Sequence, residues 1–444
     1  MKDIKVGLIN LGCDKNRIDS EIMLGRINKE LVLTNKIEEA HVLIINTCGF
    51  IEASKQESIN TIIEMARYKE DNCKVLIATG CLTQRYGDEL LELMPELDAI
   101  LGVNDYDKIL EVIDKAFTTE EKIVLCSTDS EGVNEGERII TTSAHSAYLR
   151  IAEGCDNKCA YCAIPGIRGK YRSRTKESII AEAKSLTKQG VKEIILVAQD
   201  TTCYGKDIYG KKVLHELVRE LSLINGIDWI RILYCYAEEI TDELIKEIKE
   251  NEKVCKYLDI PMQHISDNIL KKMRRRGRRA QIERNIRKLR EEIPNINLRT
   301  TFIVGFPGET NEDFTELYEF IKEVKFDKMG VFKYSKEEGT EAYNMEDQID
   351  EDIKIEREEK LMLLQQGISY EKNQSLIGRT YKVLVDNFDG EVYVGRNFGM
   401  APEVDGDVII SCEEELTLGS FINVKITSAM EYDLIGVIVN ESCE

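Results

Sequence analysis

The sequence predicts an α/β protein of three parts: a small doubly wound domain, a partial (β/α)6 barrel and a small antiparallel β-barrel at the C-terminus. Continuous apolar runs, typical of strands buried on both faces of a parallel sheet, alternate with periodic helices over most of the chain. The length of 444 residues suggests about three domains. Residues 376–444 change to short alternating runs with glycine-containing turns between them, which favours a small antiparallel barrel.

Residues 1–119 contain three apolar runs that each end in a cysteine beside a glycine. The runs end at Cys13, Cys48 and Cys81, and helices are predicted after them at Arg17–Lys29, Ile51–Tyr68 and Tyr86–Met94. Ligands bind at the carboxyl ends of the strands in an open α/β sheet, so the three thiols can converge on one point. A buried cysteine is often only a small apolar residue, but three alike favour a three-thiolate cluster.

Residues 141–371 contain six strand-then-helix units, which suggests an incomplete version of the eight-fold barrel. The predicted strands are Ala147–Glu153, Glu193–Gln199, Trp229–Tyr234, Lys256–Ile260, Asn297–Gly305 and Lys328–Tyr334. The helix Ser178–Lys188 is strongly periodic, with Gly190 as its stop signal. The charged helix Glu351–Gln374 is predicted to connect to the third domain, residues 374–440, and the polar segment 127–141 is interpreted as a linker.

Cys155, Cys159 and Cys162 form a CxxxCxxC run in the loop that follows the first strand of this barrel. Three closely spaced thiolates can hold a cubane iron–sulfur cluster and leave one iron open to a substrate or cofactor. The alternative is a zinc knuckle, which favours a fourth Cys or His at a set distance, and none follows here. The remaining cysteines share no pattern and are interpreted as structural or incidental: Cys73, Cys126, Cys203, Cys235, Cys255, Cys412 and Cys443.

The formal net charge of −21 disfavours nucleic-acid binding through bulk attraction. The predicted third domain follows this trend, because residues 376–444 contain 4 basic and 13 acidic residues. We therefore expect this domain to dock a basic protein and not to bind RNA directly. The sequence shows no apolar run of membrane-spanning length and no secretory signal pattern, so we expect a cytoplasmic protein that does not contact membranes.

These motifs resemble those of a known family. The CxxxCxxC loop, with Tyr161 before its last cysteine, resembles the radical S-adenosylmethionine (SAM) enzymes. The three strand-end cysteines resemble the N-terminal domain of the methylthiotransferases, and the terminal barrel is similar to their TRAM domain, so the match covers essentially the whole chain. The segments Leu11–Asn16, Asn46–Ser58 and Val394–Gly406 resemble the branch that modifies protein twelve of the small ribosomal subunit.

The resemblance implies two 4Fe–4S clusters, one on each set of three cysteines. Cys155, Cys159 and Cys162 would hold the cluster that generates a radical from SAM, and Cys13, Cys48 and Cys81 would hold an auxiliary cluster that carries the sulfur. Tyr161, Gln199, Gly305 and Glu309 are predicted to contact SAM. The product would be a β-methylthio group on an aspartate of the ribosomal protein, which would be free or in the ribosomal particle. A reducing electron donor is also implied.

Other readings of the residues remain open. His264 follows the fourth predicted strand and is equally consistent with a structural and a catalytic role. The arginines of Arg274–Arg279 either form a solvated helix face or include one that meets a substrate carboxylate. The main functional alternative is a tRNA methylthiotransferase acting on a modified adenosine, which would share every cysteine in both clusters. A zinc or electron-transfer protein and a radical enzyme without sulfur transfer are further alternatives.

Overall fold

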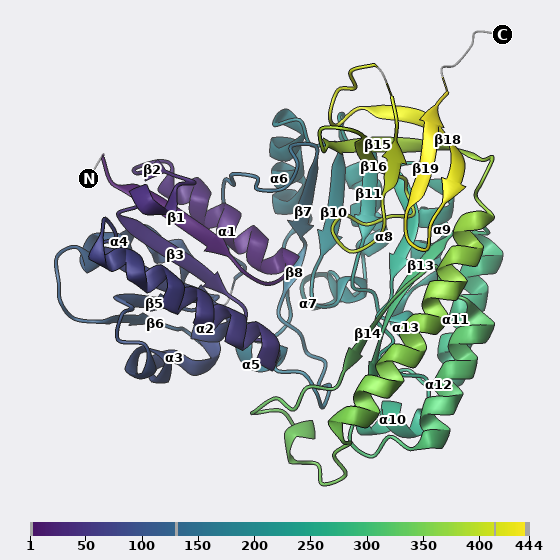
Figure 1. Cartoon of the computed structure of the whole chain (residues 1–444), viewed down its shortest axis with the longest axis horizontal. Coiled ribbons are helices and arrows are strands. Elements are labelled where there is room, and N and C mark those ends of the chain that lie inside the picture. Colours follow the sequence, from purple (N-terminus) through teal and green to yellow (C-terminus); the bar gives the residue numbers. More distant parts are fainter. Residues whose placement is uncertain (1–2, 129–131, 413, 440–444) are drawn as a thin grey trace.

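The computed structural model describes residues 3–128, 132–412 and 414–439 of the chain. Two open parallel sheets and one closed barrel follow one another along it, as Figure 1 shows. Residues 129–131 of the predicted linker, residue 440 of the predicted third domain and Cys443 lie outside the described residues. Within the described ranges, no helix is both long and apolar enough to cross a membrane.

The first sheet has six strands in the order β2-β1-β3-β4-β5-β6, and all of them are parallel. The strands are β1 Lys5–Asn10, β2 Val32–Leu33, β3 Val42–Thr47, β4 Val75–Gly80, β5 Ala99–Leu101 and β6 Ile123–Leu125. The helices are α1 Asp14–Ile27, α2 Glu52–Ala66, α3 Cys81–Leu93 and α4 Ile109–Ala116. Side chains of α1 and α4 pack in one hydrophobic cluster and those of α2 and α3 in another, which confirms a doubly wound domain.

The start of α3 differs from the prediction. The helix begins at Cys81, directly after Gly80, and not at Tyr86. Gly80 has a φ of +105°, which ends the strand sharply, and no helix-breaking residue lies between it and Tyr86. Cys81 is therefore the first residue of a helix rather than part of a strand-end loop.

The second sheet is also parallel, in the order β14-β13-β12-β11-β10-β7, and it is open, with β7 and β14 at its edges. Its strands are β7 Ser146–Arg150, β10 Glu193–Val197, β11 Trp229–Ile232, β12 Val254–Asp259, β13 Asn297–Val304 and β14 Lys328–Lys333. Its helices are α5 Ile164–Arg168, α6 Lys176–Lys188, α7 Lys206–Tyr209, α8 Leu214–Ser222, α9 Asp242–Glu250, α10 Asp267–Lys272, α11 Arg279–Glu292 and α12 Asn311–Val324. The prediction of a partial (β/α)6 barrel is confirmed, and we call this unit the half-barrel.

The predicted strand Ala147–Glu153 is divided into two. After Arg150 the chain leaves the half-barrel, and β8 Ala152–Glu153 pairs with β9 Arg172–Ser173 in a separate antiparallel ladder. This pair of short strands brackets residues 154–171, which include the CxxxCxxC loop. The division therefore fixes both ends of that loop beside the edge strand β7.

The C-terminal barrel is closed, with the strand order β15-β16-β17-β19-β18. Its strands are β15 Thr380–Phe388, β16 Tyr393–Arg396, β17 Val408–Ile410, β18 Phe421–Ala429 and β19 Leu434–Ile438, and α13 Glu351–Gln374 leads into it. Four of the five strand pairs are antiparallel as predicted, whereas β17 and β19 are parallel. In Figure 1 the barrel (yellow) lies against the half-barrel, at the opposite end of α13 from α10.

Glu193 at the start of β10 joins the C-terminal barrel to the half-barrel. Its fully buried carboxylate accepts from Arg231 Nε at 2.8 Å and from Arg396 Nη2 at 2.7 Å. Arg231 also donates to the backbone oxygen of Phe398 at 2.7 Å. Burial alone would raise the pKa of Glu193, but Arg396 and Arg231 lower it to about 2. A single carboxylate thus balances one arginine from each domain.

We expect Glu193→Gln to reduce the free energy of unfolding by roughly 3–5 kcal/mol, because Arg231 would remain buried without its anion and Arg396 would keep only Asp386. In the natural chain this stabilisation is present above the ordinary glutamate pKa of about 4.3 and is lost as the pH falls towards 2. Urea unfolding at several pH values measures both effects. Glu64→Gln, on an exposed turn of α2, is the matched control, and equal midpoints for the two variants would contradict the prediction.

Candidate functional site

Cys13, Cys48 and Cys81, which we call the strand-end trio, lie at one edge of the first sheet. Cys13 follows β1 and is the N-cap residue of α1, Cys48 follows β3, and Cys81 follows β4 as the first residue of α3. These three strands are neighbours in the sheet, and β1 and β3 flank the point where the strand order reverses. Ligands of doubly wound proteins bind outside the carboxyl ends of the strands at this point.

Two glycines bring the trio together. A Cβ atom on Gly12 would lie 2.9 Å from Cys48 Cβ and 3.2 Å from Cys48 Sγ. A Cβ atom on Gly49 would lie 2.8 Å from the backbone nitrogen of Leu82 and 3.1 Å from the carbonyl carbon of Cys81. Real Cβ atoms do not approach other atoms at 2.8–2.9 Å, so any side chain at these positions would push the three cysteine loops apart.

Cys81 lies in a positively charged and polar environment. Arg168 Nη2 lies 3.6 Å from Cys81 Sγ and donates to Asn16 Oδ1 at 2.6 Å, and Cys81 Sγ itself lies 3.5 Å from that oxygen. Burial raises the pKa of the Cys81 thiol to about 12, although the charge of Arg168 acts in the opposite direction. A buried cation beside three thiols suits an anionic iron–sulfur cluster, so the residues present fit such a group.

Cys155, Cys159 and Cys162, which we call the loop trio, lie between β8 and α5. Cys155 N donates to the backbone oxygen of Gly169 at 3.1 Å, and Ala160 N donates to that of Met273 at 3.0 Å, so the loop is anchored at Cys155 and between Cys159 and Cys162. Burial raises the pKa of Cys155 to about 11 and that of Cys162 to about 12. Both sets of thiols would therefore lose protons when they bind a metal centre.

Among the residues that the structure describes, no three His, Cys, Asp or Glu side chains are placed to hold one metal ion. A zinc site requires that its ligands surround one ion. In a cubane each thiolate binds a different iron, so the two trios do not need to meet that condition.

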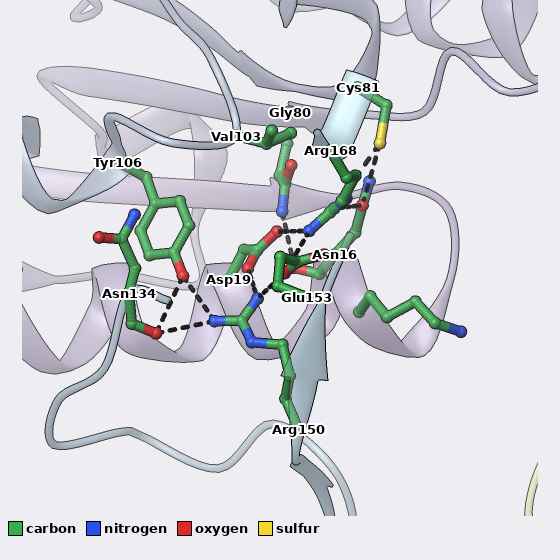
Figure 2. A network of polar contacts seen from close by, with 12 residues as sticks. Asn16, Asp19, Gly80, Cys81, Val103, Tyr106, Asn134, Arg150, Glu153 and Arg168 are labelled. Atoms are coloured by element: carbon green, nitrogen blue, oxygen red, sulfur yellow. Dashed lines mark hydrogen bonds and ion pairs between the residues drawn. The ribbon is translucent and has the colours of Figure 1, made fainter. Parts of the chain in front are cut away.

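Four buried charges connect the two trios, and Figure 2 shows them at close range. Arg150 Nη1 lies 2.5 Å from Asp19 Oδ1 and 2.7 Å from Glu153 Oε2. Arg168 Nη1 lies 2.9 Å from Asp19 Oδ2 and 3.1 Å from Glu153 Oε2. Burial would raise the pKa of Glu153, but the two arginines lower it to about 2. We call these four residues the junction cluster.

The junction cluster crosses the boundary between the first domain and the half-barrel. Asp19 comes from α1, whereas the other three members come from β7, β8 and α5. Arg168 reaches the strand-end trio directly, and Glu153 lies two residues before Cys155 of the loop trio. Tyr106 Oη and the backbone oxygen of Asn134 accept from Arg150 Nη2 at 2.7 Å and 2.9 Å.

A second ionic contact holds the first domain to the other edge of the half-barrel. Glu337, which follows β14 and is buried, lies 3.2 Å from Lys55 Nζ and 3.0 Å from Arg85 Nη1. The backbone nitrogen of Glu52 donates to the same carboxylate at 2.8 Å. Because β7 and β14 are the two edge strands, the first domain is attached to both edges.

Two of the predicted SAM-binding residues lie beside the loop trio. The Tyr161 ring packs edge-on against Phe306, with 6.5 Å between the ring centroids. Gln199 Nε2 donates to Glu153 Oε1 at 2.7 Å, so this side chain extends the junction cluster towards the half-barrel. Within the described residues Gln199 Oε1 is buried without a hydrogen-bond partner, and it remains able to accept from a ligand.

Gly305 and Glu309 lie in the loop after β13 and make contacts that anchor this loop to α13. A Cβ atom on Gly305 would lie 2.2 Å from Lys354 Cγ, so this glycine allows α13 to pack closely. Glu309 is buried and accepts from Arg357 Nη1 of α13 at 2.7 Å. Burial raises the pKa of Glu309 to about 7, although Arg357 opposes this shift. These contacts favour a structural role for Glu309, and its predicted contact with SAM stays a prediction.

His264 and Arg275 are held by neighbouring groups. The fully buried His264 accepts at Nδ1 from the backbone nitrogen of Ser266 at 3.0 Å, and burial lowers its pKa to about 3. Arg275 is buried, with its guanidinium 4.1 Å from the Tyr236 ring centroid and one nitrogen 2.9 Å from the backbone oxygen of Pro261. These contacts account for Arg275 structurally, whereas His264 Nε2 lies 3.8 Å from Glu309 Oε2 and is buried without a hydrogen-bond partner among the described residues.

The other arginines of the basic segment have partners as well. Arg274, Arg276 and Arg279 form ion pairs with Glu341, Glu239 and Glu283, respectively, and Arg278 donates to the Arg275 carbonyl. The basic segment thus pairs with groups of the same chain, but residues 274–278 lie between α10 and α11 and Arg275 is buried, so the expectation of a solvated helix face is wrong.

The junction cluster was not predicted from the sequence. Arg150 did carry a signal, because it interrupts an apolar strand and a charge there requires a buried partner. Asp19 and Arg168 carried none, because charged residues on short polar segments usually face water. Only the packing of α1 against β7 and of α5 against α3 reveals that they are buried.

Family models match three parts of the chain. Residues 5–102 match the model described as "Uncharacterized protein family UPF0004", residues 149–321 match the "Radical SAM superfamily", and residues 377–439 match the "TRAM domain". Each match falls on one of the three units of the fold.

Curated relatives match the chain over its whole length. A protein of Clostridium acetobutylicum is 58% identical over 442 residues, which cover 99% of both chains. A protein of Clostridium tetani is 56% identical over 444 residues and covers 100% of both. A protein of Clostridium perfringens is 59% identical over 446 residues, again with full coverage. All three are named "Ribosomal protein uS12 methylthiotransferase RimO".

Solved structures of much lower identity share the fold. The radical SAM methyltransferase TsrM from Kitasatospora setae, with cobalamin and a [4Fe-4S] cluster bound, matches with a TM-score of 0.55 and 14% identity, covering 74% of this chain and 75% of its own. The cobalamin-dependent SAM radical enzyme OxsB matches with a TM-score of 0.52 and 13% identity, covering 81% of this chain and 56% of its own.

We expect Arg150→Met to loosen the first domain from the half-barrel, because Asp19 and Glu153 would keep only one shared cation. Breaking one partner of a buried ionic group typically costs roughly 3–5 kcal/mol. Urea unfolding of the metal-free protein measures the loss, and glutamyl endopeptidase should cleave residues 132–141 faster. Arg284→Met, on an exposed position of α11, is the control. Unchanged unfolding and cleavage in Arg150→Met would show that the junction cluster does not hold the domains.

Proposed function

Because this chain belongs to the family of ribosomal protein uS12 methylthiotransferases, we propose that it adds a methylthio group to that ribosomal protein. This proposal rests mainly on the sequence identity of 56–59% with curated relatives over the full length of both chains. The chain is a SAM-dependent methylthiotransferase of the radical SAM type, with all three domains that its family implies.

We further propose that the acceptor is the β-carbon of an aspartate side chain. The CH₃S group replaces one hydrogen of that carbon, which carries no acidic proton that a side-chain base could remove readily. When bound, an iron–sulfur cluster and SAM supply a carbon radical that can take a hydrogen atom from such a position. This requirement accounts for a radical SAM domain in an enzyme that modifies a protein.

The two trios have separate roles in this proposal. Cys155, Cys159 and Cys162 hold the 4Fe–4S cluster that works with SAM. Cys13, Cys48 and Cys81 hold a second 4Fe–4S cluster that carries the sulfur. The count of two is supported by the shared edge of β1, β3 and β4 and by the glycines that bring those loops together.

The chain's own side chains position these groups. Arg168 faces the strand-end trio and offsets its negative charge. Gln199, with a free acceptor oxygen at the end of β10, can accept from the SAM amino group, and Tyr161 and Gly305 shape the same end of the half-barrel.

The substrate protein would dock on acidic surface. Asp386, Glu403 and Asp405 of the C-terminal barrel pair with basic residues of this chain: Asp386 with His145 and Arg396, Glu403 with Arg17, and Asp405 with Arg299. Other acidic residues of the barrel are exposed: Asp389, Glu391, Glu414 and Glu415. These charges favour a basic protein over RNA. We expect the enzyme to act in the cytoplasm, on free uS12 or on the ribosomal particle, with a reducing electron donor.

We expect the anaerobically reconstituted enzyme, supplied with SAM and a chemical reductant, to methylthiolate uS12 and not tRNA. Mass spectrometry of both substrates after one reaction gives the answer, with fragmentation of uS12 locating the modified residue. Heat-denatured enzyme is the control. Product on a modified adenosine of tRNA, with none on uS12, would establish the alternative function instead.

We expect Cys48→Ala to abolish product while leaving part of the reductive cleavage of SAM, because only the sulfur-carrying site is damaged. Cys126→Ala is the matched control, since Cys126 follows β6 at the same edge of the sheet but outside the trio. Iron and sulfide content, 5′-deoxyadenosine and methylthiolated uS12 are measured for both variants. Normal product from Cys48→Ala would remove the role assigned to the strand-end trio.

A further inference from the structure

Lys15 is a buried cation beside the strand-end trio for which the proposed function gives no role. It is the second residue of α1 and follows Cys13 by two positions. Its side chain is only 10% exposed, and its ammonium group lies 3.1 Å from the centroid of the Tyr234 ring. Its ion pair, with Asp14 Oδ1 at 3.3 Å, is long.

This placement is unfavourable for folding. Removing an ammonium group from water is costly unless close partners replace the lost hydration. The first turn of a helix adds to the cost, because the positive end of the helix dipole repels a cation. Asp14 offers little compensation, since its Oδ2 atom is buried and has no hydrogen-bond partner among the described residues. A cation kept under these conditions suggests a ligand that completes the site.

The surroundings of Lys15 are held in place from the half-barrel. Tyr234 follows β11 at the carboxyl end of the sheet and has a φ of +59°, a left-handed conformation that is strained for a tyrosine. Its backbone nitrogen donates to Asp259 Oδ2 at 3.2 Å, and its hydroxyl donates to Asp14 Oδ1 at 3.0 Å. The strained backbone holds the ring beneath Lys15, where the first domain meets the active end of the half-barrel.

Lys15 has fewer polar partners than two other buried cations near the trios. Arg168 is engaged by Asp19, Glu153 and Asn16, and Arg275 by the Tyr236 ring and a backbone oxygen. The Lys15 ammonium has three donors and uses one of them in its long contact with Asp14. It therefore has the capacity to bind an added anion.

We propose that Lys15 binds the carboxylate of the side chain that the enzyme modifies, and so determines specificity for an acidic residue. This inference rests on the proposed function. The β-carbon of an aspartate is bonded directly to its carboxyl carbon, so a fixed carboxylate also fixes the carbon that reacts. Lys15 lies beside Cys13, and this places that carbon next to the strand-end trio. On binding, the ammonium exchanges its long contact with Asp14 for the substrate carboxylate.

Two peptides that cover the target loop of uS12, one with the natural aspartate and one with asparagine, test the inference. The reconstituted natural enzyme should bind the aspartate peptide at least about tenfold more tightly, because asparagine leaves the buried ammonium with only its long contact to Asp14. Lys15→Met should bind both peptides with similar affinity, and Lys15→Arg should keep part of the preference. Fluorescence anisotropy gives the dissociation constants, with iron content and urea unfolding recorded for each variant.

Lys29→Met, at the exposed end of α1, is the matched control and should keep the full preference. A SAM-binding measurement separates the two possible carboxylates, since SAM carries one as well. If Lys15→Met lost SAM affinity but kept the preference for the aspartate peptide, the inference would be overturned. If the natural enzyme formed methylthio product on neither peptide, the proposed function would be overturned, and this inference with it.

Asp14→Asn provides a second test that does not remove the cation. Asp14 competes with the substrate carboxylate for Lys15, so its neutralisation should tighten binding of the aspartate peptide and leave binding of the asparagine peptide nearly constant. Unchanged or weaker binding of the aspartate peptide by Asp14→Asn would count against the inference, even if Lys15→Met does not fold.

Discussion

The junction cluster of Asp19, Arg150, Glu153 and Arg168 sets the relation between the two cysteine trios. Two anions and two cations are buried together, and each is within 3.1 Å of both opposite charges. Such a group is stable only when all four members are present, because an incomplete set leaves a buried charge unpaired. Asp19 lies on the first domain and the other three on the half-barrel, so the docked arrangement satisfies all four charges at once. The large desolvation cost of these charges is offset only when the two domains dock in this specific arrangement.

A second buried carboxylate performs the same task at the opposite end of the half-barrel strands. Glu193, the first residue of β10, pairs with one arginine of its own domain and one of the C-terminal barrel. Between the two ionic groups, one hydrophobic cluster contains residues of α1, of the half-barrel strands and of the C-terminal barrel, among them Ile22, Trp229 and Leu384. Apolar burial thus supplies the nonspecific attraction between the three units, while the charges select one orientation.

The sequence could predict the features that depend on local periodicity and spacing. Apolar runs marked β3 and β4 because strands buried on both faces exclude polar residues, and the CxxxCxxC spacing marked the loop trio because one cluster needs nearby thiolates. The division at Arg150 could not be predicted, because apolar residues continue on both sides of this arginine, as they would in a single strand. Nor could the junction cluster, since the same charged residue types serve an exposed surface equally well. The acidic barrel was predicted from composition, but composition does not reveal that Asp386 and Asp405 face cations of the same chain.

The sheet of the half-barrel is open, and its two free edges determine where the first domain docks. Six strands leave the sheet with two edges, β7 and β14, where a closed eight-strand barrel would have none. The first domain contacts both: Asp19 meets Arg150 at the end of β7, and Lys55 and Arg85 meet Glu337 after β14. Two ionic attachments at opposite edges prevent rotation about either one, which the polar linker alone could not do. The position of the strand-end trio relative to the loop trio is therefore fixed by buried charge on both sides of the active end, and glycines at the cysteine loops complete the placement.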